Sequence, residues 1–299
     1  MSLASGQPLR RGSREVIRCS PAVTDLNSDT AETATITLNE ACTVDLDRLG
    51  AIACINALTA TGLYPTHSFA NKIALLDGSQ LRGNQPLVVG RNSPNAAFNM
   101  DPRRLRPRFV RFGRQDFQSQ DTVAIEAIIQ GTALKCDFSV AVVSSSGLVA
   151  PQYSPTSAPR LLGAAASGDI AADNATNEIK MTADEAGWIN MSNLGMECLP
   201  AAVAATEEAP NADGLGSLSV HAITLPGGVQ LVQGEGDREA PATIWSNQRP
   251  YDFVDLGWVY MSAGSVITFE VRNRGVDVLR AAISAPFWAD SRGPSGGCR

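Results

Sequence analysis

The sequence predicts an all-β protein with two tandem β-sandwich domains, jelly-roll-like and related by internal duplication. Two observations lead to this prediction: the second half of the chain repeats the pattern of the first, and apolar residues alternate with polar ones along short segments. In addition, 26 glycines and 17 prolines among 299 residues favour many turns over long helices.

The duplication is visible as blocks that align in the same order at a nearly constant spacing. Three pairs of blocks align, the first at a shift of 145 residues and the other two at 144: Thr37–Gly50 with Thr182–Gly195, Phe109–Gly113 with Phe253–Gly257, and Val123–Glu126 with Ile267–Glu270. One such match arises easily by chance, but three in one register do not. We therefore expect two copies of one domain.

Strand-like alternation supports the same fold inside each copy. Thr43–Asp47 and Trp188–Ser192 alternate polar and apolar residues, as Thr122–Ile129 and Ser265–Val271 do in outline. About eight short strands per copy fit a sandwich or jelly roll.

The sequence also suggests where the copies begin and end. Segments rich in Ser, Pro, Gly and Ala flank and separate them. The predicted division is an N-terminal arm at 1–30, a first β-sandwich at 31–147, a linker at 148–177, a second β-sandwich at 178–290 and a C-terminal tail at 291–299.

No motif in the sequence predicts catalysis or a cofactor. The two histidines, His67 and His221, occupy different positions in the two copies, and the repeated Glu126 and Glu270 lie in strand-like settings. No cysteine has a zinc-ligand spacing, and the acidic loop at 234–239 fits a polar turn better than a calcium loop. We expect a protein that is not an enzyme and holds no metal or cofactor.

Arginine provides the candidate contact residues. The formal net charge is −6, yet residues 1–150 hold 15 basic and 13 acidic residues, against 9 and 17 in residues 151–299. The basic positions predicted to contact another subunit or a genome are Arg10, Arg11, Arg14, Arg103, Arg104, Arg106, Arg108 and Arg111. Phosphate binding, pairing with acidic surface on a neighbouring chain, and a solvated face with no partner are the three interpretations. Pairing is favoured over phosphate binding because the chain is acidic and because Asp255 in the second copy stands at the position of Arg111.

Two fused β-sandwiches, terminal arms and no catalytic residues resemble the tandem (double) jelly-roll major capsid proteins of icosahedral bacteriophages. The resemblance is one of architecture and covers both halves. It implies a virion structural protein that self-assembles, as trimers, into an icosahedral shell. It further implies other virion proteins as partners, nucleic acid or membrane contact through the N-terminal arm, and assembly in the host cytoplasm. Removing residues 1–18 is then expected to impair assembly and leave the β-core folded.

Two other functions stay open at this point. A head-decoration or tail-tube protein of a tailed phage would also show a repeated β-domain. The four tryptophans, all in the second copy, would suit a two-domain carbohydrate-binding protein, although packing is the commoner use of tryptophan: Trp188, Trp245, Trp258 and Trp288.

Overall fold

A computed structural model describes most of the chain outside several loops and both ends. The described residues are 13–27, 30–57, 67–75, 80–82, 87–92, 98–99, 114–130, 135–149, 151, 153–155, 158–172, 174–200, 218–234, 236–245, 254–275 and 278–290. They form strands and two short 3-10 turns, η1 (Met191–Asn193) and η2 (Ala242–Trp245). No α-helix, and hence no helix long and apolar enough to cross a membrane, occurs among them.

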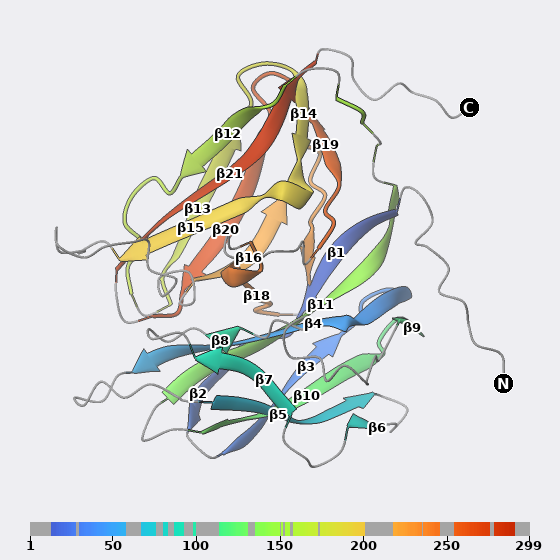
Figure 1. The fold of residues 1–299 in the computed structure, drawn as a ribbon, viewed down its shortest axis with the longest axis vertical. Helices are drawn as coiled ribbons and strands as arrows, with labels where there is room; N and C mark the ends of the chain where they lie inside the picture. The colour runs from blue at the N-terminus through green and yellow to red at the C-terminus, as the bar shows by residue number, and fades with distance from the viewer. Residues whose placement is uncertain are drawn as a thin grey trace.

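The first sandwich consists of two antiparallel sheets drawn mainly from the first half of the chain, in the lower part of Figure 1. One sheet contains β1 (Ser13–Cys19), β2 (Val23–Asn27), β4 (Cys42–Ala57), β9 (Arg114–Phe117) and β11 (Lys135–Val149). The other contains β3 (Ala31–Thr37), β5 (His67–Leu75), β6 (Gln80–Arg82), β7 (Leu87–Asn92), β8 (Phe98–Asn99) and β10 (Thr122–Gln130).

The second sandwich lies above the first in Figure 1 and again has two antiparallel sheets. One sheet contains β12 (Arg160–Ala165), β14 (Gly187–Asn190), β15 (Gly195–Pro200), β19 (Trp258–Met261) and β21 (Leu279–Ala289). The other contains β13 (Thr176–Thr182), β16 (Leu218–Thr224), β18 (Ala240–Pro241) and β20 (Val266–Asn273). A remaining strand, β17 (Val232–Gln233), leaves this half and joins the first sandwich.

The strand registers confirm two tandem β-sandwiches related by internal duplication. In the first copy β3 pairs with β10 so that Thr37 faces Thr122, and in the second β13 pairs with β20 so that Thr182 faces Val266. These are the same pairs displaced by 145 and 144 residues. Likewise Cys42 faces Phe117 across β4 and β9, and Gly187 faces Met261 across β14 and β19.

The core of each sandwich is built by the alternation seen in the sequence. Along β20 the odd-numbered residues Ile267, Phe269 and Val271 are fully buried, whereas Glu270 is exposed. Apolar side chains of one sheet thereby meet those of the other, and their removal from water drives the packing.

The structure differs from the sequence expectation at the start of each copy. Strand β1 lies inside the expected arm, and β12 lies inside the expected linker. The two strands are equivalent, because Ile17 faces Val143 across β1 and β11 while Arg160 faces Phe287 across β12 and β21. Each copy therefore begins with a strand upstream of the predicted boundary. Since β1 is buried in a sheet, removing residues 1–18 would delete part of the β-core, contrary to the expectation above.

Candidate functional site

The two copies are joined by a strand pairing that crosses between them. Strand β17 of the second half runs parallel to β1, with Ile17 facing Val232 and Arg18 facing Gln233. The backbone N–H of Ile17 donates to the carbonyl of Leu231 at 3.0 Å. The outer edge of β1 is thus covered by the other sandwich, and the two copies are held in a fixed relation. We call this contact the β1–β17 junction.

A glycine allows the backbones to approach closely at the junction. A Cβ atom at Gly234 would lie 2.4 Å from the carbonyl oxygen of Cys19 and 3.0 Å from Cβ of Arg238. Real Cβ atoms do not come so near a backbone oxygen, so a larger residue would push β17 away from β1. Nearby, Pro21 and Arg238 form an antiparallel bridge, and the N–H of Glu239 donates to the carbonyl of Ser20 at 3.2 Å.

Arg18 provides the buried polar centre of the junction. Arg18 is 2% exposed, and its Nε donates to Oγ of Ser144 at 2.9 Å. Its guanidinium also donates to the side chain of Gln233 and forms a 2.5 Å ion pair with Glu40. The charge of a buried arginine is costly unless it is paired in this way. Arg18 therefore connects both copies through one side chain.

Arg14 and Glu15 extend the junction to the far end of β1. Nη2 of Arg14 donates to the carbonyl of Trp258 at 2.9 Å, and Glu15 accepts from the N–H of Asp255 at 2.7 Å. Burial lowers the pKa of Arg14, and the charge of Asp255 partly opposes that shift. Both partners belong to the second copy, so these charged residues of β1 bind within the chain.

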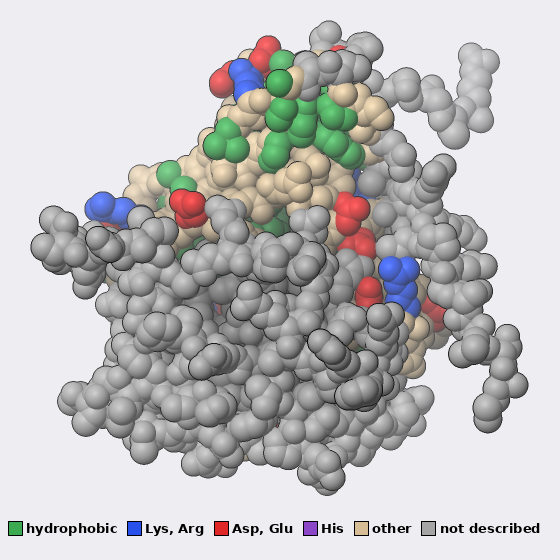
Figure 2. All heavy atoms as spheres, in the orientation of Figure 1, with side chains coloured by type: hydrophobic (Ala, Val, Ile, Leu, Met, Phe, Trp, Pro, Cys, Tyr) green, Lys and Arg blue, Asp and Glu red, His purple; other side chains and the backbone are tan. Residues whose placement is uncertain are grey.

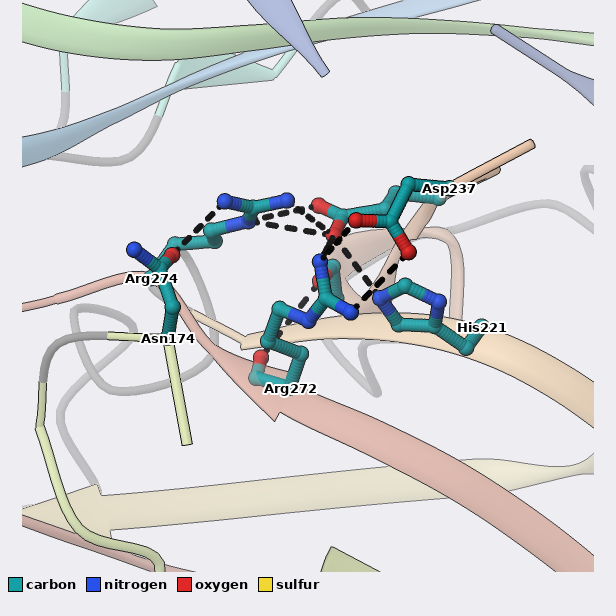
Figure 3. Close-up of polar contacts among 7 residues, drawn as sticks. Asn174, His221, Asp237, Arg272 and Arg274 are labelled. Atoms are coloured by element: carbon teal, nitrogen blue, oxygen red, sulfur yellow. Dashed lines mark hydrogen bonds and ion pairs between the residues drawn. The ribbon is translucent and has the colours of Figure 1, made fainter. Parts of the chain in front are cut away.

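A buried carboxylate lies beside the junction at the base of the second sandwich. Glu239 is 2% exposed and accepts from Nε2 of His221 at 2.8 Å and from Nη1 of Arg272 at 3.0 Å. Nε of Arg274 contacts its two oxygens at 3.1 and 2.9 Å. Figure 3 shows His221 and the two arginines converging from neighbouring strands. We call this set the Glu239 cluster.

Two further side chains complete the Glu239 cluster. Arg272 donates to both carboxylate oxygens of Asp237, at 3.0 and 3.1 Å, and Arg274 donates to Asn174 at 2.6 Å (Figure 3). Burial acts to raise the pKa of Glu239, but hydrogen bonds from His221 and Arg274 and their charges outweigh it, so that the pKa lies below its ordinary value of 4.5. The cluster is a network of ion pairs that holds the loop after β17 against β16 and β20.

The same contacts explain the role of the acidic loop at 234–239, which the sequence analysis considered as a calcium loop. Its two described carboxylates, Asp237 and Glu239, are occupied by arginine and histidine side chains. His221, which the sequence places in no catalytic motif, is a structural partner of Glu239. Among the residues that the structure describes, no group of three or more His, Cys, Asp or Glu is placed to hold a metal ion.

The aromatic residues of the second copy pack against one another. Tyr153, from the expected linker, stacks on Trp188 with ring centroids 4.9 Å apart and also meets the edge of Trp258 at 5.2 Å. Trp258 in turn contacts Trp288 at 4.9 Å. Figure 2 shows hydrophobic side chains gathered at the top of the second sandwich, where Figure 1 places the upper ends of β14 and β21. A ring face of Trp188 is thus covered by the chain's own tyrosine.

Of the arginines predicted to contact other molecules, the structure describes only Arg14. It places Arg14 against Trp258 of the same chain. The others lie outside the described residues: Arg10, Arg11, Arg103, Arg104, Arg106, Arg108 and Arg111. The sequence analysis missed Gly234 and the Glu239 cluster. The sequence holds one signal for the cluster: Arg272 and Arg274, on and just after a strongly alternating strand, have the uncharged counterparts Ile128 and Gln130 in the first copy.

The comparisons with known proteins give low similarity. No family model and no curated protein matches the sequence. Among solved structures, the chain aligns with the major capsid protein P2 from Bacteriophage PM2 over 94% of this chain and 99% of that one, at 10% identity and a TM-score of 0.21. It aligns with PBCV-1 VP54 over 94% and 95%, at 10% identity and 0.23, and with the STIV MCP over 94% and 99%, at 8% and 0.20. The fold assignment rests on the sheets and their repeated registers.

Proposed function

We propose that the protein is a virion structural protein, a shell subunit that self-assembles with other copies of itself. The observation that carries the proposal is the pair of duplicated sandwiches fixed in one relation by the β1–β17 junction. A rigid chain with two similar copies presents each type of contact surface twice, so that a few chains can form a ring of near-equivalent contacts. Trimers, with six sandwiches, are the proposed building block.

The chemistry of the described residues supports a structural role. The three most deeply buried charged groups among the described residues, Arg18, Glu239 and Glu15, are engaged by partners within the chain. They stabilise the relation between the copies. The stacked rings of the second copy likewise serve packing, since Tyr153 lies on Trp188.

The proposal also covers the binding partners of the protein and its location. Contacts with other chains are assigned to the arginine-rich segment at 103–111 and to Arg10 and Arg11, with acidic surface of a neighbouring second copy as partner. Other virion proteins, and nucleic acid or membrane near the N-terminal segment, are proposed as further partners. The proposed location is the virion, assembled in the host cytoplasm.

Sedimentation of the purified full-length chain tests this function. We expect trimers or larger particles, visible also by electron microscopy. The triple variant Arg103→Glu, Arg104→Glu and Arg106→Glu should shift the chain toward monomer with an unchanged circular dichroism spectrum. The matched control reverses three exposed cations on described strands: Arg114→Glu, Lys180→Glu and Arg280→Glu. A chain that stays monomeric at high concentration contradicts the proposed function.

A further inference from the structure

Strand β12 presents an apolar side chain at the edge of its sheet. It pairs with β21 on one side, and among the described residues no strand pairs with its other side. Leu161 on this strand is 72% exposed, the most exposed large hydrophobic side chain that the structure describes. In Figure 1, β12 lies on the outer left side of the second sandwich. Soluble proteins normally protect such an edge with charge, a bulge or a cover.

The duplication shows what covers the equivalent edge in the first copy. Because Ile17 of β1 corresponds to Arg160 of β12, Arg18 corresponds to Leu161. Arg18 is buried beneath the second sandwich, and β17 pairs along its strand. The same edge is therefore covered in one copy and exposed in the other.

The first sandwich also carries the counterpart of the covering strand. Immediately before β17, Thr224 and Gln230 form a bridge; at the same place in the first copy, Ala74 of β5 pairs with Gln80 of β6. Each residue of the second pair lies 150 positions before its counterpart in the first pair. The sequences agree as well, since Gly78-Ser79-Gln80-Leu81 matches Gly228-Val229-Gln230-Leu231 at three of four positions. Strand β6 is thus the first copy's equivalent of the segment that leads into β17.

Within one chain these two elements are far apart. Figure 1 places β6 at the lower right of the first sandwich and β12 at the upper left of the second. They can meet only when β6 belongs to one chain and β12 to another.

We propose that the open edge of β12 binds the β6 segment of a second copy of this chain, in a parallel pairing that repeats the β1–β17 junction between chains. Arg160 and Leu161 would face the segment around Arg82, as Ile17 and Arg18 face Val232 and Gln233. Backbone hydrogen bonds supply the attraction, and burial of Leu161 adds to it. Each chain offers one donor and one acceptor, so the contact is head-to-tail and closes into a ring when the rotation allows. The inference rests on the proposed self-assembly and names the surface that carries it.

Disulfide trapping between two differently tagged chains tests the pairing. One chain carries Arg160→Cys and the other Arg82→Cys, the two positions equivalent to Ile17 and Val232, both in the full-length background, and mild oxidation is applied to the mixed assembly. We expect a crosslinked heterodimer that reducing agent removes. The matched control replaces Arg160→Cys by Val278→Cys, at an exposed residue that precedes β21. No crosslink above this control in assembled protein overturns the pairing.

Charge on the edge gives a second, independent readout. Leu161→Lys should raise the concentration needed for assembly by about tenfold or more, whereas Val278→Lys should leave it near that of the parent chain. The two proposals fail differently. If the parent chain assembles and Leu161→Lys assembles equally well, only the β12–β6 pairing is overturned; if the parent chain remains a monomer, both are overturned.

Discussion

Nε of Arg274 lies 3.1 and 2.9 Å from the two carboxylate oxygens of Glu239, and both residues are nearly inaccessible to solvent. Arg272 and His221 approach the same carboxylate. One anion thus satisfies several buried donors, and the stability of the second sandwich depends on that anion.

The substitution Glu239→Gln removes the charge and leaves two arginines without their buried counter-ion. We expect a loss of about 3–5 kcal/mol in the free energy of unfolding. Urea unfolding followed by tryptophan fluorescence measures it, since every tryptophan lies in the second copy. Glu178→Gln, which breaks an exposed pair with Lys180, is the control and should cost less than about 1 kcal/mol. Equal effects of the two substitutions would refute the role of the buried carboxylate.

Acid should weaken the fold through the same cluster. The pKa of Glu239 is lowered from 4.5, and an ion-paired hydrogen bond from Arg272 lowers the pKa of Asp237 from 3.8. Unfolded chains therefore bind more protons than folded ones in the range below those ordinary values. Stability is fully present above that range and is lost as the pH falls through the folded-state pKa values.

Urea midpoints measured across this acidic range test the dependence. The parent chain should lose stability on acidification more steeply than Glu239→Gln, which no longer has that carboxyl group. Asp169→Asn is the control, because Asp169 pairs with Arg280 at the surface and its loss should leave most of the acid sensitivity in place. Parallel curves for the parent chain and Glu239→Gln would contradict the prediction.

Gly234→Ala should loosen the β1–β17 junction. The added methyl group would lie 2.4 Å from the carbonyl oxygen of Cys19, so the two backbones must separate. We expect a cost of about 1–3 kcal/mol and faster proteolysis near β1. Gly168→Ala is the matched control, since a Cβ there meets nothing within 4 Å. Thermal unfolding and limited proteolysis of both variants provide the measurements, and an unchanged melting temperature for Gly234→Ala would show that the close approach is unimportant.

Tyr153→Ala should detach the segment before β12 from the second sandwich. The substitution removes the ring that stacks on Trp188 and meets Trp258. The expected loss is about 1–3 kcal/mol, with tryptophan emission shifted to longer wavelength as water reaches Trp188. Tyr153→Phe keeps the ring and loses only the hydroxyl contact with Asp290, at 3.2 Å, so it should behave nearly as the parent chain.

Truncation at two points separates the N-terminal segment from the fold. A chain lacking residues 1–12 should keep its β-sheet circular dichroism, because β1 begins at Ser13. A chain lacking residues 1–18 should unfold or aggregate, because it loses Arg14, Glu15 and Arg18 from the junction. Equal spectra and equal melting temperatures for the two truncations would show that β1 is dispensable.

The sequence predicts the duplicated sandwiches well because the information is local. Alternation in Ser265–Val271 marks a strand whose inner face is buried in the structure, its counterpart Thr122–Ile129 also forms a strand, and the spacing of these blocks matches the strand registers. Prediction from the sequence fails at β1 for a physical reason. Arg14, Glu15 and Arg18 look solvent-exposed, and their burial makes sense only with partners more than 100 residues away.

The Glu239 cluster could not be predicted for a similar reason. Its members come from the segment before β13, from β16, from the loop after β17 and from the end of β20. Only the fold brings His221, Arg272 and Arg274 to one carboxylate, and Asn174 to Arg274. The composition of β12 does not predict a strand, since Gly163 and the three alanines that follow it are typical of a linker. Its pairing with β21 is visible only in three dimensions.

The junction also constrains the order of events during synthesis. Arg18 and Gln233 are 215 residues apart along the chain, so the ribosome must make most of the protein before β1 receives its neighbour. Until then the outer edge of β1 has no strand paired with it, and an unpaired strand edge makes a partly synthesised chain prone to aggregate. The second sandwich therefore completes the protection of the first.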